Sequence, residues 1–178
     1  MDIVAHGLWA TAAAVGAKTK LRGHIRVGWA AWWGVFPDLF AFTAPVTISL
    51  WQRLTDPVQA ASQSTPHVML HMPLARDLYQ ISHSLIVMML VFGLVWLVRR
   101  RPAFELLAWA LHVSMDIPSH TTRFFATPFL WPISSYRFSG ISWGNRWFMM
   151  CNYGALVIVY VYLWRNSRRG AEESKPLH

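Results

Sequence analysis

Two long apolar segments without a single charged side chain restrict the fold of this chain more than any other feature. Leu78 to Val98 and Trp147 to Trp164 contain no Asp, Glu, Lys or Arg. A helix needs about 20 apolar residues to cross a hydrocarbon core about 30 Å thick, so both segments are predicted to span a membrane. Only 13% of the residues are charged, against about 25% in an ordinary soluble domain. The chain is therefore predicted to be an integral membrane protein.

Three further segments complete a predicted all-α fold, a polytopic membrane helix bundle of about five transmembrane helices. They are Val27 to Gln52, Pro102 to Pro118 and the shorter Ala5 to Ala17, which we expect to tilt or to stop short. Pro37 removes an amide donor inside the first of these, so a kink or break is expected at Pro37-Asp38. The sequence predicts one membrane-embedded helical domain over residues 1–169 and a polar C-terminal tail over residues 170–178.

The basic residues indicate how this bundle is oriented. They lie in short clusters between apolar segments, a distribution typical of membrane orientation signals rather than of a nucleic-acid-binding surface. The three clusters are Lys18 to Arg26, Arg99 to Arg101 and Arg165 to Arg169. Because cytoplasmic loops are enriched in Lys and Arg, we expect the N-terminus outside and the C-terminus in the cytoplasm.

Two long loops are then predicted on the outer side. The polar stretch from Leu54 to Pro73 could form a mobile lid, and it carries His67 and His71 as a candidate accessory site. The aromatic stretch from Phe124 to Trp143 is expected to lie along the membrane surface or to re-enter the membrane.

Ionisable residues within or beside the apolar segments are the strongest indication of function. Such a side chain costs at least a few kcal/mol inside a bilayer, and more when it has no partner. With the N-terminus outside, most of them fall near the outer membrane face, and Asp38 joins them only if its helix bends or enters shallowly. We therefore predict one metal site whose candidate ligands are His6, Asp38, His83, His112, Asp116 and His120.

The spacing of His112 and Asp116 supports this prediction. Residues four apart share a helical face, and imidazole with carboxylate suits Zn²⁺, with Mn²⁺ or Fe²⁺ as alternatives. The aspartate could instead accept a hydrogen bond from a ligand's other ring nitrogen. Structural alternatives stay open for each residue: a polar terminus at His6, a helix start capped by Ser82, a helix break at Pro37-Asp38, a His112–Asp116 hydrogen bond, and a His120 turned away after Pro118.

The order of these motifs resembles the YdjM-like family of inner-membrane proteins, some under LexA control, described as metal-dependent hydrolases. The resemblance extends from Met1 to Pro132 and uses His6-Gly7, Pro37-Asp38, Ser82-His83-Ser84, His112 with Asp116, and Thr127 to Pro132. It implies an inner-membrane location and the ligands His6, Asp38, His83, His112 and Asp116. Phe40 and Leu78 stand where the family commonly has an Asp and a His, which favours one ion over two unless His120 replaces a lost ligand.

These observations lead to a functional hypothesis. The chain is expected to hydrolyse a lipid or lipid-linked substrate, a phosphoester above all, at the outer membrane face. A metal-activated water would attack, Asp116 or Asp38 would take its proton, and Arg123 or Arg137 would pair with a substrate phosphate. The alternatives are a non-catalytic metal- or haem-binding protein, a small transporter with a broken helix at Pro37-Asp38, and a purely structural partner protein.

Overall fold

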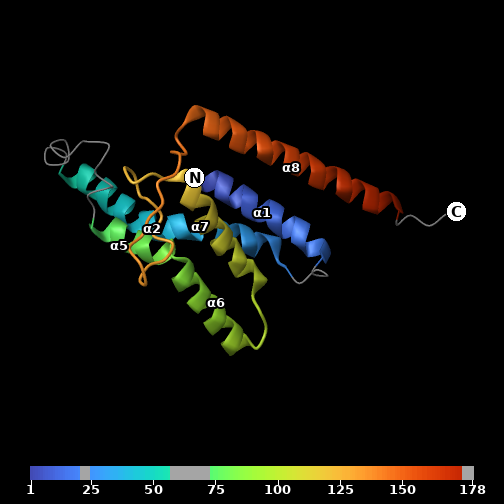
Figure 1. Ribbon diagram of the computed structural model, residues 1–178, viewed down its shortest axis with the longest axis horizontal. Coiled ribbons are helices and arrows are strands. Elements are labelled where there is room, and N and C mark those ends of the chain that lie inside the picture. The colour runs from blue at the N-terminus through green and yellow to red at the C-terminus, as the bar shows by residue number, and fades with distance from the viewer. Residues whose placement is uncertain (21–24, 57–72, 174–178) are drawn as a thin grey trace.

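The computed structural model describes residues 1–20, 25–56 and 73–173, and over these residues the chain is helical with no strand. Within these described ranges, six α-helices and one 3₁₀ helix follow one another (Figure 1). Their bounds are α1 Ile3–Lys20, α2 Val27–Thr55, α5 Pro73–Ser82, α6 Leu85–Arg99, η1 Phe104–Leu106, α7 Leu107–Ser119 and α8 Arg146–Glu173. The all-α fold class predicted from the sequence is confirmed.

Fewer helices qualify as membrane spans than the sequence predicts. Val27–Thr55 and Arg146–Arg169 are long and apolar enough to cross a bilayer, and the pair α5 and α6 qualifies when taken together. The 13 residues of α7 reach only about 20 Å at 1.5 Å per residue. The described part of the chain therefore contains two candidate spans, or three with the bent pair.

The predicted span from Leu78 to Val98 is not a single straight helix. It is divided into α5 and α6, whose axes differ by 56°, with His83 in the break. The Ser84 hydroxyl accepts a hydrogen bond from the Val87 amide at 3.1 Å and so caps the start of α6. The cap is thus Ser84, whereas Ser82 is the last residue of α5. Uncharged composition alone gave no sign of this bend.

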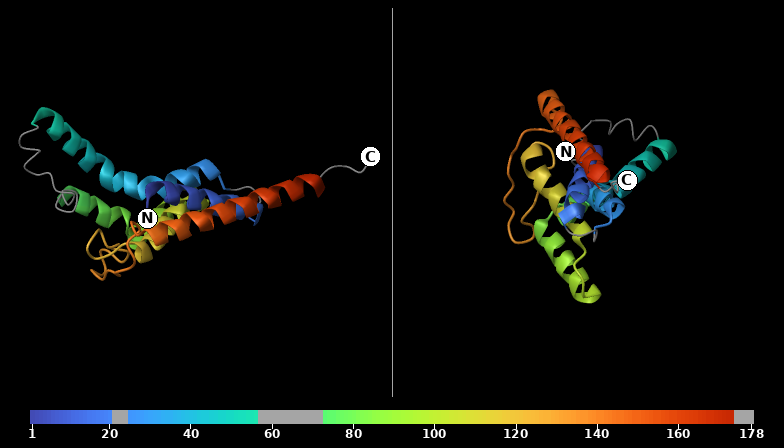
Figure 2. Two further views of the ribbon diagram at one scale, coloured as in Figure 1. Left: turned by 90° about the horizontal axis from the view of Figure 1, so that it is seen from above. Right: turned by 90° about the vertical axis from the view of Figure 1, so that its right-hand side faces the viewer.

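In contrast, α2 is not broken at Pro37-Asp38. It continues through both Pro37 and Pro45, two prolines that are buried, and it changes direction along its length (Figure 2). Asp38 therefore reaches the centre of the protein from a continuous helix rather than from a helix end.

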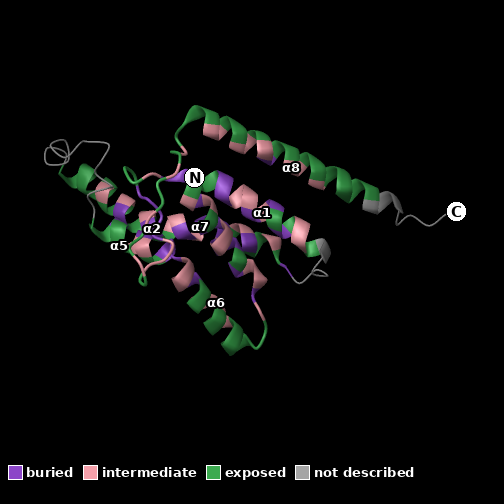
Figure 3. Ribbon diagram, in the orientation of Figure 1, coloured by how far each residue is buried: buried purple, intermediate pink, exposed green. Residues whose placement is uncertain are grey.

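Close contact between α1 and α2 depends on two glycines. A Cβ atom added to Gly34 would lie 2.3 Å from the Cβ of Ala10, and one added to Gly7 would lie 3.1 Å from Val35 Cγ1. Small residues let membrane helices approach closely, and here they bring the start of α1 against the middle of α2. Buried residues accordingly concentrate where α1, α2 and α7 meet (Figure 3).

The non-helical segment between α7 and α8 folds back over the α5–α6 break. The amide of Gly140 donates to the carbonyl of His120 at 2.8 Å, and the amide of Leu85 donates to the carbonyl of Phe129 at 3.0 Å. The Ser84 hydroxyl also donates to the Trp131 carbonyl. The loop thus holds the end of α7 and the start of α6 together. Most of the predicted lid, residues 57–72 with His67 and His71, lies outside the described residues; its ends belong to helices, since α2 runs to Thr55 and α5 begins at Pro73.

Candidate metal centre

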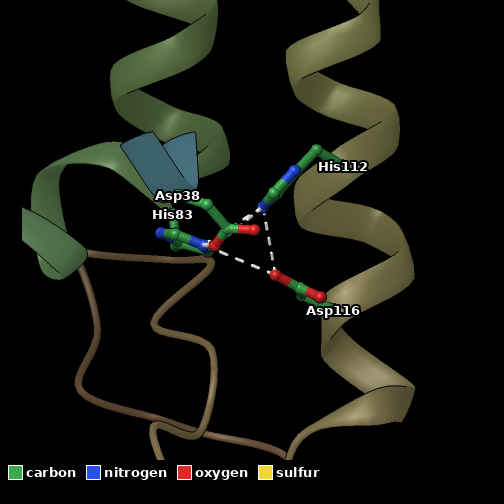
Figure 4. A group of neighbouring side chains, drawn as sticks. All are labelled: Asp38, His83, His112 and Asp116. Carbon is green, nitrogen blue, oxygen red and sulfur yellow. Dashed lines mark hydrogen bonds and ion pairs between the residues drawn. The ribbon is translucent and has the colours of Figure 1, made fainter. Parts of the chain in front are cut away.

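Two carboxylates and two imidazoles from three parts of the chain point toward one another (Figure 4). Asp38 comes from α2, His83 from the α5–α6 break, and His112 with Asp116 from α7. One ligand atom from each of the four lies within 4.8 Å of the others. Tertiary structure therefore brings together four of the six ligands predicted from the sequence.

The distances between these atoms are those of ligands around one ion. The Nε2 atoms of His83 and His112 are 3.2 Å apart. Asp116 Oδ2 lies 3.2 Å from the His112 Nε2 and 3.4 Å from the His83 Nε2. Asp38 Oδ1 lies 3.4 Å and 3.7 Å from the same nitrogens of His83 and His112. Neighbouring ligand atoms in a tetrahedral zinc site, with metal–ligand bonds of about 2.0–2.1 Å, are about 3.3 Å apart.

Contacts on the outer side of each imidazole fix its orientation. His112 Nδ1 donates to the Gly34 carbonyl at 2.7 Å, which leaves the Nε2 lone pair of a neutral ring directed at the cluster. His83 Nδ1 is 2.9 Å from the Ser82 hydroxyl, and the His83 ring stacks on Tyr79 with centroids 3.7 Å apart. Both rings are therefore held with Nε2 turned inward.

The two carboxylates differ in how far they are buried. The side chain of Asp116 is 1% exposed, whereas that of Asp38 is 16% exposed. Asp116 Oδ2 is also a buried atom that forms no hydrogen bond within the described part of the chain. A buried carboxylate oxygen left in this state is costly, and a bound ion would remove the cost.

The second oxygen of Asp116 contacts the remaining two predicted ligands. Oδ1 lies 3.0 Å from His6 Nε2 and 3.3 Å from His120 Nδ1, and it contacts the Met1 amino nitrogen. The Ser119 hydroxyl donates to it at 3.4 Å. Pro118 does not turn His120 away, because the α-helix continues through this proline to Ser119.

The two arginines predicted to bind substrate lie in the loop after α7. Arg123 is exposed, and the half-buried Arg137 donates from Nη1 to the carbonyl of Ala126 at 3.4 Å. Over the described residues, neither forms a hydrogen bond or ion pair with the histidines and aspartates of the cluster. Both remain predictions.

Four contributors to the site were not predicted from the sequence: the Met1 amino group, Tyr79, Ser119 and the Gly34 carbonyl. Tyr79 and Ser119 lie at helical spacing from His83 and Asp116, four and three residues away, and that spacing was an available signal. Gly34 contributes only its backbone carbonyl, and the identity of a residue does not reveal where its carbonyl points.

No protein-family model, curated protein or solved structure matches the chain. The functional interpretation therefore depends on the geometry of the described residues.

Proposed function

We propose that this protein is a membrane-embedded, metal-dependent hydrolase of a lipid or lipid-linked phosphoester, with zinc as the preferred ion. The observation that carries the proposal is the pair of imidazole Nε2 atoms 3.2 Å apart, both within 3.4 Å of one buried carboxylate oxygen. The order of motifs that resembles the YdjM-like hydrolases agrees with this function.

The burial difference assigns separate roles to the two carboxylates. Asp116 is inaccessible, and with His83 and His112 it forms a set of two imidazoles and one carboxylate, a donor set of catalytic zinc sites. Asp38 is the partly exposed member, and its Oδ1 lies 3.4 Å from His83 Nε2. Asp38 is thus suited to act as the general base that takes a proton from the attacking water.

A divalent cation at this position supplies Lewis acidity and activates water for attack near neutral pH. The chain's own residues do the rest. The Gly34 carbonyl and the Ser82 hydroxyl hold the imidazoles in place, and Arg137 or Arg123 binds a substrate phosphate through bidentate donors.

The arrangement disfavours a bis-histidine haem. Axial imidazoles must lie on opposite faces of an open slot that is wide enough for a porphyrin. Here two carboxylates lie next to the facing Nε2 atoms, in the space that a macrocycle would need. A single divalent cation such as Zn²⁺ fits this set of imidazole and carboxylate donors better.

We further propose a topology of about five membrane passes in an inner membrane, with the N-terminus outside, the C-terminus in the cytoplasm and the site near the outer face. The parallel course of α1 and α8, which lie side by side, supports it, because both then start on the same side (Figures 1 and 2). Fluorescence of a C-terminally fused green fluorescent protein would agree with this topology, and activity of a fused periplasmic phosphatase would contradict it.

Elemental analysis of the detergent-purified protein tests the metal site. We expect a stoichiometric divalent metal in the wild type and its loss in His112→Ala and Asp116→Ala. The exposed Asp77 on α5 offers a matched control, and Asp77→Asn should retain the metal. A wild type that binds no metal after dialysis against Zn²⁺ would refute the proposal.

Hydrolysis tests the catalytic role. Suitable probes are p-nitrophenyl phosphate and phosphatidic acid in mixed detergent micelles. Asp38→Asn should keep the metal and lose about 10²–10⁴-fold in rate, the range expected for a general base. Equal rates in Asp38→Asn and Asp77→Asn would exclude Asp38 as the base.

A further inference from the structure

The start of α2 and the end of α6 enclose a cleft of about 300 Å³, together with the turn η1. Its lining includes Arg26, Trp29, Trp33, Val95, Arg99 and Glu105. Arg26 precedes Asp38 by 12 residues, which corresponds to about 18 Å along a helix at 1.5 Å per residue. The cleft is therefore separate from the candidate metal centre.

Two guanidinium groups give this cleft a positive charge. Arg26 and Arg99 are both exposed, and within the described ranges neither guanidinium forms an ion pair. The guanidinium of Arg26 lies 5.8 Å from the ring centroid of Trp29. Glu105 also lines the cleft, and its Oε1 accepts a hydrogen bond from the main-chain amide of Arg26 at 3.1 Å. One carboxylate against two guanidiniums leaves the lining with a net positive charge that suits an anion.

The lining changes from charged to apolar within one helical turn. Trp33 follows Trp29 by four residues on α2, and Val95 precedes Arg99 by four residues on α6, so each pair shares a helical face. The half-buried Trp33 stacks on Trp109 with ring centroids 6.0 Å apart, and this packing holds an apolar wall beside the arginines. A free inorganic anion would use only the charged end of the cleft. A phospholipid has a phosphate for that end and an acyl chain for the wall.

We propose that this cleft binds an anionic phospholipid, with the phosphate between Arg26 and Arg99 and an acyl chain along Trp33 and Val95. Guanidinium groups bind phosphate oxygens through bidentate hydrogen bonds, and basic pockets between membrane helices suit anionic headgroups. In the proposed topology both arginines lie on the cytoplasmic side, where the negative surface potential of a membrane attracts basic segments. The inference goes beyond the proposed function, because this lipid is a resident ligand and not the substrate of the metal centre.

Lipid titration of the delipidated protein in detergent, followed by native mass spectrometry, tests the inference. We expect the wild type to retain one phosphatidylglycerol per chain. Its affinity should fall about fivefold in Arg26→Gln and in Arg99→Gln, and about 25-fold in the double variant, since each arginine near a membrane surface contributes about this factor.

Arg101→Gln is the matched control. It removes the same charge two residues from Arg99, at an exposed position outside the lining of the cleft, and it should leave the affinity unchanged. Equal losses in Arg99→Gln and Arg101→Gln would indicate general attraction to a basic surface and would overturn the site. A wild type that retains no phosphatidylglycerol would also overturn it.

Two further measurements test the choice of ligand. Inorganic phosphate at the concentration of the lipid should not displace it, and displacement would overturn the choice of a phospholipid over a free anion. Equal affinity for phosphatidylcholine would overturn the choice of an anionic headgroup. Zinc content should be the same in the wild type and in all three arginine variants, so failure of the lipid site and failure of the proposed hydrolase are distinguishable.

Discussion

The helices α2 and α8 are nearly equal in length and similar in hydropathy, yet they have opposite places in the molecule. The mean hydropathy of the most apolar window is 1.2 in α2 and 1.4 in α8. The buried residues of α2 include Gly34, Pro37 and Ala41, and this helix carries Asp38 into the candidate metal centre. In α8 Leu156 is the buried residue of the described part, whereas many other apolar side chains are exposed, Ile158 by 71%.

Polar contacts differ in the same way. Those of α8 are made with α1 and with the residue that precedes it: Tyr153 donates to Asp2 at 2.9 Å, and Tyr160 donates to the Leu8 carbonyl at 3.0 Å. The Gly34 carbonyl of α2 instead orients His112, a candidate metal ligand. Hydropathy thus identifies a helix that suits a bilayer, whereas small residues and one carboxylate identify the helix that builds the site.

Gly34→Ala on α2 should have the largest effect on stability and metal affinity. If it did not, α2 and α8 would not differ in how they support the site. The new methyl group would lie 2.3 Å from Ala10 Cβ, so α1 must move away from α2. We expect the free energy of unfolding to fall by about 1–3 kcal/mol, as in overpacked cores. Metal affinity should fall by about 10–100-fold, because the Gly34 carbonyl orients His112.

Thermal unfolding in detergent and Zn²⁺ titration measure these two quantities. Gly154→Ala on α8 is the matched control, because nothing lies within 4 Å of the added Cβ. It should leave metal affinity unchanged. Equal behaviour of the two variants would show that close contact between α1 and α2 does not support the site.

Tyr153→Phe should have a smaller effect that is confined to stability. It removes the hydrogen bond to Asp2 that attaches α8 to α1, a loss of about 0.5–1.5 kcal/mol in the free energy of unfolding. Metal content should not change, since α8 contributes no ligand to the cluster of described residues. Tyr162→Phe, at an exposed position of the same helix, is the control and should be neutral.

The smallest effect is expected for Ile158→Ala. This side chain is 71% exposed, and such surface positions usually change the free energy of unfolding by less than about 0.5 kcal/mol. Val113, which is fully buried on α7, provides the contrast, and Val113→Ala should cost about 1.5 kcal/mol or more. Denaturation curves that rank the two variants in the reverse order would mean that α8 packs against a partner.

Much of the site was predictable because an ionisable side chain in an apolar segment costs free energy and therefore stands out in the sequence. His83 in an uncharged stretch, and His112 with Asp116 on one helical face, are conspicuous in the sequence. The division of four histidines between Oδ1 and Oδ2 of Asp116 was not predictable, because helical spacing fixes which face a residue occupies but not which oxygen its neighbours approach.

The prolines also show that local sequence does not decide where a helix bends or breaks. Pro37 predicted a kink or break: α2 changes direction along its length but does not break, because packing against α1, α5 and α7 compensates for one missing amide donor. The bend in the predicted span from Leu78 to Val98 has no proline, and it arises at Ser82-His83-Ser84, where the Ser84 hydroxyl caps a new helix.

The amino-acid sequence by itself determined that the chain is helical and apolar and that its rare imidazoles and carboxylates need partners, because hydropathy and the cost of burial are properties of each residue. Only the tertiary structure decided which of them meet. Separations of 3.2–3.4 Å between His83, His112 and Asp116 depend on how helices that are remote in the sequence pack, and on glycines that let α1 approach α2.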